Sequence, residues 1–185
     1  MSGRRLTEVA HAALAAVLAD GARAIDATVG NGHDTLFLAS RVGPGGRVIG
    51  FDVQPRAIDA AAARLGAAGV GKVVTLHHAG HEQMLTRIPA EWCGTVAAIT
   101  FNLGYLPGGD KSWVTQPAST VDALQQAASV LRRGGLLSVM VYHGHPGAAA
   151  EARAVAEWIT GLDAAYRVTC HRSPGPTLYL VERLL

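Results

Sequence analysis

The sequence predicts an α/β fold with a mostly parallel β-sheet, and three observations lead to this prediction. Short apolar runs typical of strands alternate with stretches in which apolar residues recur every three or four positions, as on one face of a helix. Parallel neighbouring strands need crossover helices of this kind. The last two apolar runs are separated only by turn residues 173–176, which predicts that the sheet closes with an antiparallel strand pair.

Length and composition restrict the class of protein. A chain of 185 residues with 49% hydrophobic and 16% charged residues predicts one folded domain over residues 1–185 and excludes a disordered chain. The net charge of +2 does not by itself indicate nucleic-acid binding. The sequence has no apolar run of membrane-spanning length and no secretory signal, so we expect a cytoplasmic protein without a membrane partner. Cys93 and Cys170 are expected to be buried thiols, not a disulfide.

Five helices are predicted from apolar stripes and from the residues that bound them. Pro55 suits the first turn of a helix because its φ is already helical. Ser119 and Asp122 resemble a capping box, and Gly134-Gly135 is expected to end the helix that follows. The predicted helices cover residues 6–18, the stretch between the glycine turns 29–32 and 43–46, residues 55–65, residues 119–133 and residues 152–162.

Polar or glycine-rich clusters follow the first four of seven predicted strands. The carboxyl ends of parallel strands lie at one edge of a sheet, where ligands of such folds bind. We therefore expect residues 30–32, 52–54, 81–82 and 102–105 to meet in one crevice. The strands are predicted over residues 23–28, 47–53, 73–76, 96–101, 136–142, 166–170 and 178–181.

The first cluster narrows the choice of cofactor. Gly30 and Gly32 precede a helix, whose N-terminus presents free amides to a carboxylate or phosphate. The third glycine of a dinucleotide-binding motif is replaced by Thr35, which weakens the case for NAD, and the sequence has no P-loop motif. Asp52 suits the two hydroxyls of a ribose, which both NAD and S-adenosylmethionine carry.

A resemblance decides between these two cofactors. The segment DATVGNG, residues 26–32, resembles the acidic-x-Gly-x-Gly-x-Gly motif of class I S-adenosylmethionine-dependent methyltransferases, with Thr28 in place of the first glycine. This family has a Rossmann-like, doubly wound, mostly parallel seven-stranded sheet with a C-terminal antiparallel strand pair. More narrowly, the chain is similar to a bacterial family of rRNA methylases in the blocks DATVGNGHDTLFLA (26–39), GFDVQ (50–54), FNLGYLPGGDKS (101–112) and YHGHPG (142–147).

The resemblance implies a cofactor, a substrate and a set of cofactor-binding residues. The implied cofactor is S-adenosyl-L-methionine. The implied substrate is the 5-aminomethyl group of the wobble uridine, position 34, of tRNA, and the implied product is 5-methylaminomethyl-(2-thio)uridine. For Asp34 an acid favoured by the helix dipole is the alternative, and for His81 a partly exposed loop histidine. The implied cofactor residues are Asp26, which begins the motif, Gly30, Asn31, Gly32 and Asp34 at the methionine end, Asp52 at the ribose, and Gln54 and His81 beside the adenosine.

The segment from Asn102 to Tyr105 follows the fourth strand, where amino-methyltransferases carry an Asn/Asp-Pro-Pro-aromatic motif. The resemblance implies that Asn102 accepts a hydrogen bond from the target amine, although Leu103 and Gly104 replace both prolines. Tyr105 is expected to stack on the uracil ring, with a buried structural tyrosine as the alternative. Gly104 belongs to the expected substrate-binding segment.

An alkylamine is mainly protonated at neutral pH and must lose a proton before it can attack. His143 is our preferred acceptor, with His145, Tyr105 and Asp110 as other candidates. The spacing His143-x-His145 resembles a metal site but lacks a third ligand, so no metal is expected. Lys111, in the loop 102–117, is expected to contact tRNA phosphates, unless it belongs to an ordinary solvated surface.

Three functions remain open at this point. The first is methylation of the wobble-uridine amine of tRNA, and the second is methylation of rRNA or of a small-molecule amine. The third is a noncatalytic module that binds S-adenosylmethionine or RNA, against which Asn102 and Tyr105 argue. The expected partner is tRNA, at its anticodon region, and a homodimer is left open.

Overall fold

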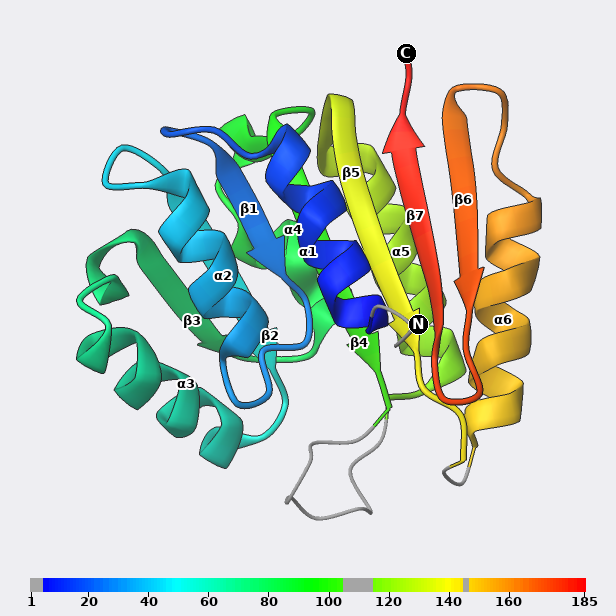
Figure 1. Ribbon diagram of the computed structural model, residues 1–185, viewed down its shortest axis with the longest axis horizontal. Helices are drawn as coiled ribbons and strands as arrows, with labels where there is room; N and C mark the ends of the chain where they lie inside the picture. Colours follow the sequence, from blue (N-terminus) through cyan, green and yellow to red (C-terminus); the bar gives the residue numbers. More distant parts are fainter. Residues whose placement is uncertain (1–4, 105–114, 145–146) are drawn as a thin grey trace.

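The computed structural model describes residues 5–104, 115–144 and 147–185, and its centre is a seven-stranded sheet in the order β3-β2-β1-β4-β5-β7-β6 (Figure 1). Strands β1 to β5 are parallel, whereas β7 is antiparallel to both β5 and β6. This confirms the predicted mostly parallel sheet with an antiparallel pair at its end. The strands are β1 (Arg23–Asp26), β2 (Arg47–Asp52), β3 (Val74–His78), β4 (Val96–Leu103), β5 (Leu131–Val141), β6 (Tyr166–Arg172) and β7 (Thr177–Arg183).

Helices cover both faces of the sheet, as parallel connections require. Figure 1 shows α1, α2 and α3 on one face and α4, α5 and α6 on the other. In the described part of the chain, no helix is long and apolar enough to cross a membrane. The helices are α1 (Leu6–Val17), α2 (His33–Val42), α3 (Pro55–Ala67), α4 (Met84–Arg87), α5 (Pro117–Val130) and α6 (Ala148–Thr160), with short 3₁₀ turns at Gly71–Val73, His81–Gln83 and Ala90–Trp92.

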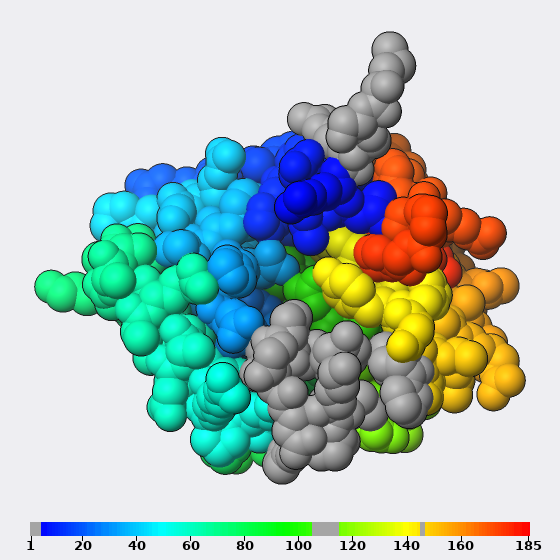
Figure 2. All heavy atoms as spheres, turned by 60° about the horizontal axis from the view of Figure 1, so that its bottom comes forward, coloured from blue at the N-terminus to red at the C-terminus, as the bar shows by residue number. Residues whose placement is uncertain are grey.

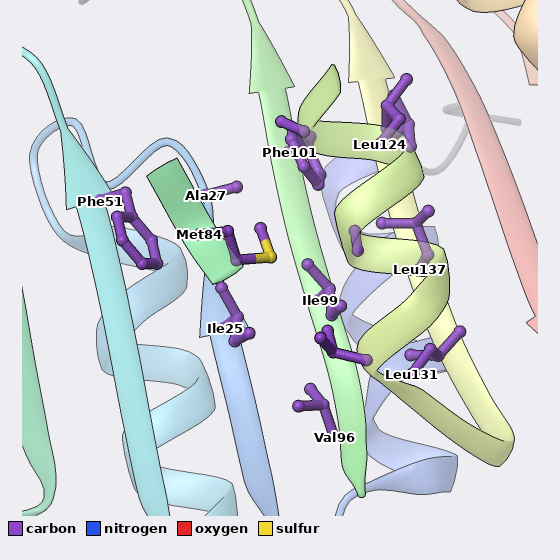
Figure 3. Close-up of a cluster of buried hydrophobic side chains, with 14 of the residues drawn as sticks. Ile25, Ala27, Phe51, Met84, Val96, Ile99, Phe101, Leu124, Leu131 and Leu137 are labelled. Atoms are coloured by element: carbon purple, nitrogen blue, oxygen red, sulfur yellow. The ribbon is translucent and has the colours of Figure 1, made fainter. Parts of the chain in front are cut away.

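Alternation along the strands divides the side chains between two cores. Ile25 of β1 and Ile99 and Phe101 of β4 belong to the cluster under α5 (Figure 3). Ala24 and Ala98, one position away, belong to the cluster under α1 and α2. Because successive side chains of a strand point to opposite faces, the polar residues at the ends of β1 and β4 face α1 and α2.

Helix α5 and strand β5 begin at other residues than predicted, and the backbone explains why. Helix α5 begins at Pro117 rather than near Ser119, because a proline favours the first helical position and keeps the preceding Gln116 extended. The Ser119 hydroxyl bonds to the Gln116 carbonyl, so the expected capping box is absent. Strand β5 begins at Leu131, and Gly134-Gly135 lies within its irregular start instead of ending a helix.

The structure also differs from the predictions in the ends of two strands, in the short helices and in the exposure of both cysteines. Strand β1 ends at Asp26, two residues early, and β4 continues to Leu103. The short helical segments between residues 81 and 92 were not predicted because they are too brief to show a period. Cys93 and Cys170 are exposed, which contradicts the expected buried thiols.

Candidate active site

The carboxyl ends of β1, β2 and β4 carry the acidic and amide side chains that the sequence places in one crevice. Asp52, at the end of β2, accepts hydrogen bonds from the backbone N–H groups of Gly30 at 2.8 Å and Gln54 at 2.9 Å. Gly30 has a φ of 52°, a conformation that favours glycine. The Asp52 carboxylate therefore ties the loop after β1 to the turn that starts α3.

Gly32 begins α2 in a left-handed conformation, with a φ of 77°. A Cβ atom at this position would lie 2.8 Å from the backbone of Ala61, so only glycine permits α3 to pack this closely. The backbone carbonyl of neighbouring Asn31 accepts a bond from Arg64 Nε at 2.7 Å. Residues 30–32 are thus held against α3 as well as against β2.

Asp26 ends β1 and is fully buried. Its carboxylate accepts hydrogen bonds from the Thr28 backbone N–H at 3.2 Å and from the Thr35 hydroxyl at 2.6 Å. Burial, together with the negative charge of Asp34, raises the pKa of Asp26 to about 7, while these hydrogen bonds oppose the rise. By these two hydrogen bonds Asp26 holds the loop between β1 and α2 in place.

Thr28 replaces a glycine of the methyltransferase motif and Thr35 a glycine of the dinucleotide-binding motif, and both threonines use their hydroxyl groups. Thr35, which weakened the case for a dinucleotide, is fully buried and donates to Asp26. The Thr28 hydroxyl accepts a bond from the backbone N–H of Asn102 at 2.7 Å. The departures from the motif thus fasten the loop to β1 and to the end of β4.

Asp34 and Asn102 form the polar centre of the site. Asn102 Nδ2 donates to Asp34 Oδ2 at 2.6 Å, and His11 Nε2 donates to Asp34 Oδ1, also at 2.6 Å. Burial alone would raise the pKa of Asp34, but the bonds from His11 and Asn102 outweigh it and leave that pKa below its usual value. Asp34 is therefore a carboxylate at neutral pH and acts only as an acceptor.

Hydrogen bonds hold the start of the segment that follows β4. The backbone of Gly104 pairs with Thr115 in both directions, since Gly104 N–H donates to the Thr115 hydroxyl at 3.0 Å and Thr115 N–H donates to the Gly104 carbonyl at 3.1 Å. Glu151 of α6 is only 1% exposed and accepts bonds from the hydroxyls of Thr115 at 2.6 Å and Thr120 at 2.7 Å.

The structure describes two of the predicted histidines, His81 and His143, and gives their contacts with residues other than Asn102. His81 is buried and tilts against Phe101, on the face that α5 covers. Its burial lowers the pKa of the ring, so it is neutral at pH 7. His143 is exposed, and its Nε2 lies 3.0 Å from the Thr177 hydroxyl of β7, on the side of β5 away from β4. The predicted residues Tyr105, Asp110, Lys111 and His145 lie outside the described residues.

Two residues at this edge were missed by sequence analysis. His11 lies within an alanine-rich helix next to no recognisable motif, which gave little indication of a role. Tyr142 directly follows β5, is 36% exposed and is joined by its backbone N–H to the Leu103 carbonyl. Figure 2 shows the surface at this end of the molecule, where blue atoms of α1 and yellow atoms of the segment after β5 border the same face.

Among described residues, no cluster of His, Cys, Asp or Glu could hold a metal.

Comparisons with known proteins give the family. Residues 48–174 match the family model described as "Putative rRNA methylase". A chloroplastic protein of Arabidopsis thaliana named tRNA (mnm(5)s(2)U34)-methyltransferase is 38% identical over 175 residues, which are 90% of this chain. This chain spans 63% of the length of that relative.

Two crystal structures are also similar over nearly the whole chain. A protein of the same family description from Clostridium thermocellum has a TM-score of 0.93 and 35% identity, with all of both chains covered. A "putative methyltransferase" from Streptococcus mutans, solved in complex with SAH, has a TM-score of 0.87 and 33% identity over 98% of this chain and 99% of that one. The chain has the class I methyltransferase fold and belongs to the family described as "Putative rRNA methylase".

Proposed function

We propose that the protein transfers a methyl group from S-adenosyl-L-methionine to the amine of the 5-aminomethyl group of uridine 34 in tRNA, forming 5-methylaminomethyl-(2-thio)uridine. The name of the Arabidopsis relative supports this substrate, and the SAH bound to the Streptococcus mutans protein supports the cofactor. One observation carries the proposal. Asn102 lies at the strand-end edge with its amide held by Asp34, next to the loop that Asp52 holds.

The residues at the ends of β1 and β2 fit this cofactor. A carboxylate has about four lone-pair positions, so Asp52 can still accept bonds from ribose hydroxyls after accepting from Gly30 and Gln54. The neighbouring Val53 is 44% exposed and offers an apolar surface for the adenine. We place the methionine end beside residues 30–32, Asp26 and Asp34, and His81 and Gln54 on the adenosine side.

The chemistry is an in-line displacement, for which the protein must mainly align the amine. When bound, S-adenosylmethionine supplies an electrophilic methyl carbon, so a nitrogen–carbon bond forms as the carbon–sulfur bond breaks and sulfur leaves as a neutral thioether. The Asn102 carbonyl oxygen accepts a hydrogen bond from the amine N–H, which directs the nitrogen lone pair toward that carbon. The amine first loses its ammonium proton, for which His143 and the predicted residues Tyr105, Asp110 and His145 remain our candidate acceptors.

RNA binding involves the same edge of the sheet. Tyr142, half-exposed beside Leu103, presents an aromatic ring to an unstacked base. Gly104 belongs to the proposed substrate-binding segment, and Tyr105 and Lys111 stay predicted contacts of the RNA. We further propose that the protein acts in the cytoplasm, and that a homodimer, if formed, enlarges the tRNA-binding surface.

Methylation of a defined tRNA tests the proposal. Purified protein is incubated with S-adenosylmethionine and tRNA carrying 5-aminomethyl-2-thiouridine at position 34, and the nucleosides are analysed by mass spectrometry. We expect one methyl group to be added at this nucleoside. The control is the same tRNA with unmodified uridine at position 34. Methyl transfer to rRNA or to small amines, with none to the modified tRNA, would contradict the proposed substrate.

A further inference from the structure

The side chains of His11, Asp34 and Asn102 form a chain of hydrogen bonds, which begins on helix α1 and ends at the Asn102 amide. Asn102 donates to one oxygen of Asp34, and the other oxygen accepts a bond from His11 of α1. These three residues come from β4, α2 and α1, respectively. The orientation of the amide therefore depends on contacts from both helices that cover this face.

The direction of each hydrogen bond in this chain is fixed by chemistry. An ionised carboxylate only accepts hydrogen bonds, so the amide end that faces Asp34 must be the NH₂ group. The Asn102 carbonyl oxygen is then the end left to accept a bond from an amine. For the same reason His11 must carry a hydrogen on Nε2. A reversed amide would present NH₂ to the amine, where it could not accept an N–H and would instead donate to the lone pair that is needed for attack.

His11 is itself firmly held. Its neighbour Ala10 and the next-turn residue Leu14 are buried under α1, and the His11 ring stacks on Phe37 with centroids 3.9 Å apart and planes 2° from parallel. The His11 side chain is 33% exposed and that of Asp34 is 20% exposed. Partial burial makes a hydrogen bond to a charged acceptor stronger than one in open water.

We propose that His11 is a positioning residue for methyl transfer, which orients Asp34 and through it holds the Asn102 amide with its carbonyl oxygen toward the amine. This inference rests on the proposed function. His11 does not touch the substrate in this scheme. It removes the rotational freedom of Asp34, which would otherwise turn toward solvent and release the amide.

Two substitutions separate the hydrogen bond from the packing of the ring. Gln in His11→Gln can place an N–H near the position of Nε2, whereas Leu in His11→Leu fills similar space without a donor. We expect His11→Leu to lower kcat by about 10-fold or more, with the KM for tRNA within about 3-fold of wild type. His11→Gln should recover most of kcat. His77→Leu is the control, because His77 also stacks on a phenylalanine, Phe51, at 5.3 Å.

The outcomes distinguish this inference from the proposed function. Equal losses of kcat in His11→Gln and His11→Leu would overturn the positioning role, since packing alone would then explain them. The side-chain amide resonances of Asn102, followed by ¹⁵N NMR, give a readout without turnover. We expect them to shift in His11→Leu and not in His77→Leu, and unchanged resonances in His11→Leu would also overturn the inference. If wild-type protein methylates no modified tRNA, the proposed function fails while this NMR test still decides whether His11 orients Asn102.

Discussion

The backbone N–H of Gly30 donates to Asp52 Oδ2 over 2.8 Å, which joins the glycine loop after β1 to the end of β2. Asp52→Ala removes this bond and the proposed acceptor for the ribose hydroxyls. We expect the Kd for S-adenosylmethionine to rise by about 10-fold or more, because hydrogen bonds to charged groups contribute about 1.5–3 kcal/mol. Calorimetric titration measures this change. Asp59→Ala, an exposed acid on α3, is the control, and equal affinities in all three proteins would remove the ribose role.

Asn102→Ala removes the proposed acceptor for the amine but leaves the cofactor residues in place. We expect kcat to fall by about 100-fold, the size of effect that misalignment of a reacting group produces. The Kd for S-adenosylmethionine should stay within about 3-fold of wild type. Single-turnover methylation and calorimetry measure the two quantities. Gln125→Ala removes an exposed amide from α5 and should change neither; a cofactor affinity that falls as far as kcat would argue against a role confined to the amine.

The buried carboxyl group of Asp26 predicts how stability depends on pH. Burial and the charge of Asp34 raise its pKa from 3.8 to about 7 in the folded protein. Between these values the folded protein keeps a proton that the unfolded chain has released. This contribution to stability is therefore complete below the unfolded pKa and is lost as pH rises through about 7.

Asp26→Asn should remove that dependence. The free energy of unfolding of wild type should fall between pH 4 and pH 8 by at most about 4 kcal/mol more than that of the variant. Urea denaturation at several pH values measures the difference. Asp122→Asn, at an exposed position of α5, should follow the wild-type curve. Parallel curves for wild type and Asp26→Asn would show that Asp26 titrates normally.

Glu151 accepts the hydrogen bonds that hold the start of the segment after β4, so we expect its replacement to lower the stability of the fold. Glu151→Leu leaves the hydroxyls of Thr115 and Thr120 without their acceptor, and we expect the free energy of unfolding to fall by about 3 kcal/mol. Glu151→Gln retains an acceptor oxygen and should lose less. Glu157→Leu changes an exposed position of the same helix and should cost less than about 0.5 kcal/mol in urea denaturation. A loss in Glu157→Leu as large as that in Glu151→Leu would contradict this assignment.

Much of the fold could be predicted because its elements are periodic. Each of the seven strands and the five long helices follows a local pattern, and Pro55 and Gly32 mark where two helices begin. The boundaries of α5 and β5 were misplaced because Ser119 and Gly134-Gly135 satisfy local rules that Pro117 and strand pairing overrule. Exposure of Cys93 was also missed, because composition alone does not decide which side of a turn is covered.

The site was predicted as a set of residues but not as a network. Parallel topology brings Asp26, Asp52 and Asn102 to one edge, and this follows from strand order. The contact between His11 and Asp34 depends on where α1 crosses the sheet, which periodicity does not determine. His143 follows the correct strand, yet its ring is bonded to Thr177 of β7, because an antiparallel neighbour lies on that side.

Phe101 and Asn102 are adjacent in β4, but their side chains point to opposite faces of the sheet. Phe101 packs in the apolar layer under α5, whereas Asn102 lies at the polar edge beside Asp34. Insertion or deletion of a single residue in this strand would exchange their sides, placing an amide in the core and a phenyl ring among the acids. A change in the length of β4 would therefore disable folding and chemistry together.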